Sequence, residues 1–188
     1  MVHVYVPEAI RRAIRAGVKS IEHGQLIDEP TMKLIAEKGV WLSMQPFIGE
    51  GNNHYTNPVQ QAKHELVVQG TDRAYQLAKK YGVKLAWGTD LLFSPANARN
   101  QNLNIEKMTR WFSNFEILKM ITHDNAELLA LSGRRNPYPG KLGVIEEGAL
   151  ADLIVVDGNA LEDIKVLTDP GKNMLLIMKD GKIYKNDL

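Results

Sequence analysis

The chain has 188 residues, of which 44% are hydrophobic, with a formal net charge of +1 and no cysteine. This length suits one or two domains with a substantial core, while the near-neutral charge and the lack of any apolar run of roughly 18–20 residues argue against nucleic-acid and membrane partners. The absence of cysteine excludes disulfides and thiolate metal sites and favours a reducing compartment such as the cytoplasm, although any targeting segment is expected upstream of Met1.

Three helical stretches in the first ninety residues each stop at a glycine followed by a valine, which opens a short apolar run. The three glycines are Gly17, Gly39 and Gly82. We expect helices over residues 7–16, 28–38 and 58–81, the last interrupted near Gly70. Short strands that are apolar on both sides are typical of buried parallel sheets, so the pattern predicts βαβ units.

The strands are expected to bring candidate ligands to one edge of this sheet. The first and third apolar runs end at His23 and Asp90, and His3 heads the first unit with no strand of its own expected in the chain. A helix of about ten residues descends about 15 Å and a strand of about five residues climbs about 16 Å, so each unit returns to the same level. His3, His23, Gln45 and Asp90 should therefore lie at the carboxyl edge, where α/β folds place their chemistry.

The second half of the chain changes character near residue 136. Residues 104–132 are expected to be helical in two or three pieces, with Thr122 or Asp124 capping the last one. A turn-rich connector over residues 136–140 is followed by three predicted strand segments. They cover residues 143–148, 151–157 and 174–184, the last folded as a hairpin by Asp180-Gly181. We therefore predict two domains, residues 1–135 and 136–188.

His3, His23 and Asp90 carry the nitrogen and oxygen donors that bind Zn²⁺ in catalytic sites, where one position stays open for water. Each has a plain alternative, as a hydrogen-bonded strand-end histidine or a turn aspartate, but their expected common level favours a metal site. Tyr5 should face the same way as His3, and it either donates a hydrogen bond to a substrate carbonyl or packs as an amphipathic ring. No site role is expected for the remaining histidines, His54, His64 and His123.

Four segments follow one another in a distinctive order. They are residues 3–10 (HVYVPEAI), 16–24 (AGVKSIEHG), 88–90 (GTD) and 141–157 (KLGVIEEGALADLIVVD). Together they resemble the amidohydrolase superfamily, specifically its imidazolonepropionase-like and prolidase-like branch. The last segment is shared by many branches, so it says nothing about the substrate.

The resemblance implies an α/β fold: the C-terminal half of a (β/α)₈ TIM-type barrel, strands five to eight, followed by a small β module of a composite sandwich domain. It implies a divalent-metal hydrolase, with zinc as the expected cofactor, acting on amide or dipeptide-like C–N bonds of Xaa-Pro type. By resemblance, His3, His23 and Asp90 bind metal at the ends of strands five, six and eight. Asp90 would also be the general base, and Tyr5 would orient the substrate.

That family also uses a His-x-His pair on the first barrel strand and a carboxylated Lys or a Glu on the fourth, which are expected upstream of Met1. Since a complete barrel needs about 250 residues, we expect a fragment that is nearly inactive alone. The alternative is a catalytically inactive half-barrel that acts as a folding or oligomerisation module, as a homo-oligomer or paired with the N-terminal half. A third possibility is a weak single-metal site of His3, His23 and Asp90.

Overall fold

The computed structural model describes residues 1–49, 55–91 and 95–188, which divide into two compact units, Met1–Gly88 and Thr89–Leu188. The first unit holds β1 Val2–Val4, α1 Pro7–Arg15, β2 Ser20–His23, α2 Glu29–Lys38, β3 Trp41–Met44, α3 Pro58–Lys80 and β4 Leu85–Trp87. The predicted domain boundary between residues 135 and 136 falls inside the second unit and stays a prediction.

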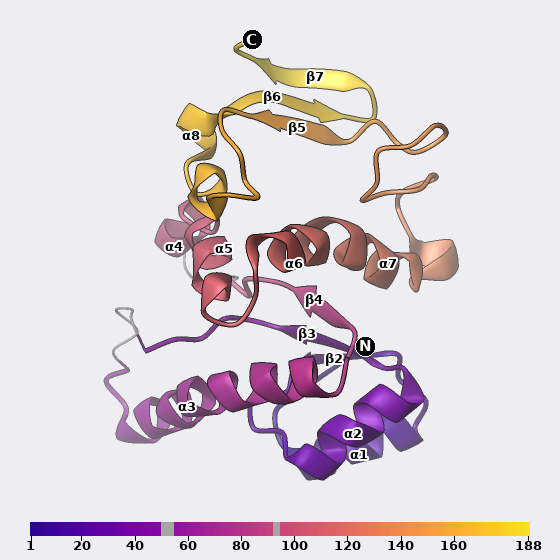
Figure 1. The fold of residues 1–188 in the computed structure, drawn as a ribbon. Coiled ribbons are helices and arrows are strands. Elements are labelled where there is room, and N and C mark those ends of the chain that lie inside the picture. The colour runs from indigo at the N-terminus through magenta and orange to yellow at the C-terminus, as the bar shows by residue number, and fades with distance from the viewer. Residues whose placement is uncertain (50–54, 92–94) are drawn as a thin grey trace. The chain divides into compact units, whose positions relative to one another are not determined.

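The first unit is a four-stranded parallel sheet in the order β1-β2-β3-β4, with α1, α2 and α3 on one side of it (Figure 1). Each helix thus leads directly to the neighbouring strand, as predicted for βαβ units. The core between the layers contains Ile10 of α1, Met32 and Ile35 of α2, and Tyr75 of α3, all at most 1% exposed. The predicted α/β architecture is confirmed, while the assignment of these strands to positions five to eight of a barrel stays a prediction.

Local signals set the ends of the helices as expected. Asp28 caps α2 by accepting a hydrogen bond from the Thr31 backbone N–H at 2.9 Å, and Gly39 ends that helix in the left-handed conformation with a φ of 60°. Arg11 of α1 donates hydrogen bonds to both Asp28 and Thr31, at 3.3 and 2.6 Å. Asp28, which caps α2, therefore also joins α2 to α1.

Two expectations about the first unit are wrong. His3 does have a strand, because Val2–Val4 pairs in parallel with β2. Helix α3 also runs without a break from Pro58 to Lys80, through Gly70. The glycine accommodates close packing: a Cβ at this position would lie 2.3 Å from the backbone oxygen of Gln25. Gly70 therefore marks a close approach between a helix and the loop after β2.

The second unit combines short helices with an antiparallel sheet. Its elements are α4 Pro95–Arg99, α5 Leu103–Lys107, η1 Met108–Arg110, α6 Asn114–Lys119, η2 Met120–Asp124, α7 Asn125–Ala130, η3 Gly133–Arg135, β5 Leu153–Val156, η4 Ile164–Leu167, α8 Pro170–Asn173, β6 Met174–Lys179 and β7 Lys182–Asn186. The sheet order is β5-β6-β7, and the predicted hairpin between β6 and β7 is confirmed. Its turn residues Asp180 and Gly181 both have positive φ, as a type I′ turn requires.

The predicted strand over residues 143–148 is wrong. A single isolated bridge joins Lys141 and Ala149 on either side of this segment, and both Gly143 and Gly148 have positive φ, which ends an extended run. Gly143 also packs so closely that an added Cβ would lie 2.7 Å from the Thr122 backbone oxygen. The segment is therefore held against the helical part of its unit and does not extend the sheet.

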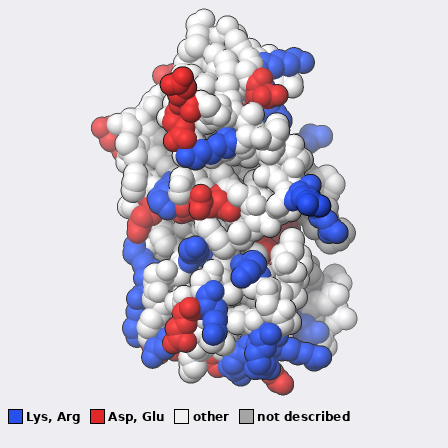
Figure 2. Space-filling model, turned by 90° about the vertical axis from the view of Figure 1, so that its right-hand side faces the viewer, with Lys and Arg blue, Asp and Glu red and all other residues white. Residues whose placement is uncertain are grey.

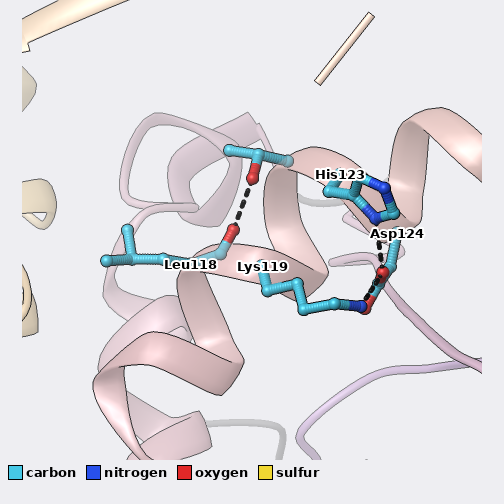
Figure 3. Close-up of polar contacts among 5 residues, drawn as sticks. Leu118, Lys119, His123 and Asp124 are labelled. Atoms are coloured by element: carbon cyan, nitrogen blue, oxygen red, sulfur yellow. Dashed lines mark hydrogen bonds and ion pairs between the residues drawn. The ribbon is translucent and has the colours of Figure 1, made fainter. Parts of the chain in front are cut away.

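Neither Thr122 nor Asp124 caps a helix, which corrects the sequence prediction. The chain passes from α6 through a single π-helical turn, η2, directly into α7. The Thr122 hydroxyl donates to the Leu118 carbonyl at 2.6 Å. Figure 3 shows the Asp124 carboxylate in contact with Lys119 and His123. Both side chains are thus engaged by their own helix.

The described surface is mixed in charge, and the face drawn in Figure 2 carries basic and acidic side chains together. Within the described residues, none of the helices combines the length and the apolar character that crossing a membrane requires.

Candidate metal centre

His3 and His23 come together at the carboxyl edge of the parallel sheet. His3 pairs in register with Glu22, so His23 lies one residue further along the neighbouring strand. The Nδ1 atom of His3 is 2.9 Å from the Nε2 atom of His23, and the two ring centroids are 5.0 Å apart. His3 is exposed, whereas His23 is only 4% exposed. The predicted meeting of these two side chains is confirmed.

The backbone is strained at the candidate ligands. Within the described residues, the non-glycine positions with positive φ are His23 at 81°, Asp90 at 54° and Asp180 at 49°. The last belongs to a hairpin turn that requires this conformation, whereas His23 is the final residue of β2 and Asp90 follows β4. Left-handed backbone at a non-glycine residue costs about 1–3 kcal/mol and clusters at functional sites. The local sequence did not predict this strain. It occurs at His23 and Asp90, two of the three predicted metal ligands.

Two neighbours hold the His23 ring. The Tyr5 ring stacks on it with a centroid distance of 4.5 Å and an interplanar angle of 7°. On the ring edge, His23 Nδ1 is 2.8 Å from Oε1 of Gln45, which also accepts a hydrogen bond from Gln25 Nε2 at 3.3 Å. The sequence predicts that Gln45 lies at the carboxyl edge of the sheet but assigns it no role, and it does not identify Gln25. The signal for both was their position just after a strand.

The His3 and His23 nitrogens fit one divalent metal with little movement. With Zn–N bonds of about 2.0–2.1 Å and tetrahedral angles, two ligand nitrogens lie about 3.3–3.4 Å apart, so the rings need to separate by about 0.4 Å. The contact to Gln45 supplies the hydrogen bond that metal-binding histidines make through their other ring nitrogen. Among the described residues, however, no cluster of three or more His, Asp or Glu side chains is suited to a metal.

The remaining predicted site residues lie elsewhere or outside the described residues. Asp90 belongs to the second unit, so its meeting with His3 and His23 stays a prediction. His64 contacts the Tyr55 ring and His123 contacts Asp124. His54 falls outside the described residues.

Parallel βα units that present convergent histidines at their carboxyl edge are the arrangement of βα-barrel enzymes. Comparison with known proteins agrees: the sequence profile described as Amidohydrolase family matches residues 1–184. The chain belongs to the amidohydrolase family.

Among characterised relatives, ochratoxinase of Aspergillus niger is 33% identical over 187 residues, covering 97% of this chain and 37% of the relative. Among solved structures, a prolidase complexed with N-methylphosphonate-L-proline is 33% identical with a TM-score of 0.84, and covers 98% of this chain and 44% of that one. A Xaa-Pro dipeptidase with methionine in its active site is 31% identical with a TM-score of 0.82, and has the same two coverages. The chain thus spans less than half of each of these relatives, two of which are a prolidase and a Xaa-Pro dipeptidase.

Proposed function

We propose that this chain provides part of a divalent-metal site that hydrolyses amide C–N bonds, with dipeptide-like substrates of Xaa-Pro type. The observation that carries this proposal is the 2.9 Å approach of His3 Nδ1 to His23 Nε2 from adjacent parallel strands. Membership of a hydrolase family supports the reaction class. Similarity to a prolidase and a Xaa-Pro dipeptidase supports the substrate class.

In this proposal His3 and His23 hold the metal, with zinc expected, and Asp90 completes the share of the site that this chain provides. A bound divalent metal would supply Lewis-acid chemistry, which generates a nucleophile from water at neutral pH. The Asp90 carboxylate accepts the proton of the attacking water and returns it to the leaving nitrogen. Tyr5 orients the substrate, and its ring also packs on His23.

The proposed site needs further ligands. Two donors meet among the described residues. Asp90 would be a third, and the resemblance implies a further His-x-His pair and a carboxylated Lys or a Glu. The chain also covers only 37–44% of its prolidase-like relatives. We therefore propose that the 188-residue chain alone is nearly inactive and that the missing ligands come from residues outside it.

Metal binding tests the role of the two histidines. The chain is titrated with zinc in competition with a chromophoric chelator, and cobalt(II) is used in parallel for its absorption spectrum. His3→Ala and His23→Ala should each weaken zinc binding by at least ~10-fold, since loss of even an outer-shell partner costs about 10–100-fold. His64→Ala is the matched control, because this histidine lies on α3, and it should leave the affinity unchanged. Equal zinc binding by all three variants would refute the proposed site.

Catalysis tests the incompleteness of the site. The zinc-loaded chain is assayed on Xaa-Pro dipeptides by following the release of proline. We expect turnover far below the 1–1000 s⁻¹ usual for enzymes. Turnover in that range that is lost in Asp90→Asn would show that the chain holds a complete site, and would contradict the proposed inactivity.

An interaction module remains the second candidate, favoured by the open edges of the parallel sheet. Strands β1 and β4 each pair with a single neighbour within the described residues. Unpaired strand edges are templates for pairing with another chain, so this candidate predicts a homodimer or pairing with another half-barrel. A compact monomer in sedimentation velocity experiments across a wide concentration range would count against it.

A further inference from the structure

Two buried side-chain amides form a row behind His23. Gln25 follows β2 and is 1% exposed, and Gln45 follows β3 and is 5% exposed. Oε1 of Gln45 lies 2.8 Å from His23 Nδ1 and 3.3 Å from Gln25 Nε2. Buried amides are costly unless they are hydrogen-bonded, so these two positions need a reason. Of the three side chains joined by these contacts, His23, Gln45 and Gln25, the titratable one is His23.

The contact with Gln45 selects one form of the His23 ring. A carbonyl oxygen only accepts hydrogen bonds, so the ring nitrogen facing it must carry the proton. In a neutral imidazole the other nitrogen then has a lone pair. That nitrogen is Nε2, which faces His3 Nδ1 at 2.9 Å. Gln45 therefore turns the ligating nitrogen of His23 towards the proposed metal.

The contact with Gln25 Nε2 favours the orientation in which the Gln45 oxygen faces His23. If the Gln45 amide were reversed, its NH₂ group would meet the NH₂ group of Gln25. Within the described structure, Oε1 of Gln25 is buried without a hydrogen-bond partner, and such a group costs about 1–3 kcal/mol. Gln25 is also held from behind, because Gly70 brings α3 against its backbone.

We propose that Gln45, oriented by Gln25, is a positioning residue that fixes the tautomer and orientation of the His23 ring for metal binding. The inference rests on the proposed function, in which His23 is a metal ligand. Tyr5 complements Gln45, since the stacked Tyr5 ring restrains the face of the imidazole while the amide restrains its edge.

Two substitutions at Gln45 separate hydrogen bonding from packing. Gln45→Met keeps the length of the side chain and removes the acceptor, whereas Gln45→Glu keeps an acceptor at the same place. Long-range ¹⁵N–¹H spectra of the histidine rings in the metal-free 188-residue chain report the tautomer directly. We expect the proton on Nδ1 of His23 in the unmodified chain and in Gln45→Glu, and a shift towards Nε2–H in Gln45→Met.

Metal affinity provides the second readout. Zinc binding should fall by about 10–100-fold in Gln45→Met and recover in Gln45→Glu. Gln25→Met, which leaves the contact between Gln45 and His23 in place, should shift the tautomer in the same direction to a smaller extent. Melting curves of all variants separate these effects from loss of the fold.

The outcomes distinguish this inference from the proposed function. If His23→Ala loses zinc affinity but Gln45→Met keeps both the Nδ1–H tautomer and the affinity, the role of Gln45 is wrong and the metal site stands. If the unmodified chain carries the His23 proton on Nε2, the role of Gln45 is also wrong. If His23→Ala binds zinc as well as the unmodified chain, the proposed function itself fails.

Discussion

Gly70 lies inside helix α3, where its missing side chain lets the helix touch the loop after β2. A Cβ added there would lie 2.3 Å from the backbone oxygen of Gln25, 3.0 Å from its carbonyl carbon and 3.1 Å from Cδ2 of Leu26. The nearest atom is backbone, which cannot rotate away. We therefore expect Gly70→Ala to force the loop and the helix apart.

The size of the effect follows from two opposing terms. Alanine in a helix interior is favoured over glycine by about 0.8–1.0 kcal/mol. Overpacking of a well-packed region costs about 1–3 kcal/mol, and a contact this short with backbone belongs to the upper part of that range. The difference predicts a net destabilisation of about 1–2 kcal/mol. For a chain of this size, that lowers the melting temperature by roughly 2–8 °C.

Thermal and urea unfolding of Gly70→Ala measure the stability change. Gln69→Ala is the matched control, because Gln69 is the exposed neighbour on the same helix and its replacement should change stability by less than about 0.5 kcal/mol. The substitution should also weaken zinc binding, since moving the Gln25 backbone disturbs its hydrogen bond to Gln45. A Gly70→Ala variant stabilised by about 1 kcal/mol, as in an unconstrained helix, would refute the reasoning.

Two further predictions concern the ends of helices. Hydrogen bonds from Lys80 and then Tyr81 lower the pKa of the Glu29 carboxyl to about 2, so the stabilisation from this contact is present above pH 4.5 and is lost as the pH falls through about 2. Tyr81→Phe should raise the Glu29 pKa, measured by NMR titration, and an unchanged pKa would contradict the role of the hydroxyl. In the capping box of α6, Ser113 accepts from the Glu116 backbone N–H and its own N–H donates to the Glu116 carboxylate. Ser113→Ala should cost about 1 kcal/mol in urea unfolding while Ser113→Asp costs little, and equal stability of the two variants would argue against the cap.

The βα pattern of the first unit was predictable because its signals are local. In α2, the aspartate Asp28 caps the start of the helix and Gly39, in a left-handed conformation, ends it. Helix and strand rises then determine the level to which each unit returns. The meeting of His3 and His23 follows from these rules alone, as does the hairpin at Asp180-Gly181.

Two of the failures share a different cause, since each depends on a segment distant in sequence. Gly70 looked like a helix break because a glycine in isolation weakens a helix, but in the fold it lies within α3, where a Cβ would collide with the Gln25 backbone. Residues 143–148 looked like a strand by composition, but Gly143 packs against the turn at Thr122. Such choices depend on contacts that a local pattern does not contain.

The sequence by itself determined the family, the parallel βα order and the kinds of donor at the ends of the strands, because these depend on residue type and spacing. Only the tertiary structure decided which ring nitrogens face each other and which groups hold them. The positive φ of His23, the stacking of Tyr5 and the contact from Gln45 all bear on a single imidazole ring. They arise from atoms on three neighbouring strands and loops, whose relative positions exist only once the sheet has formed.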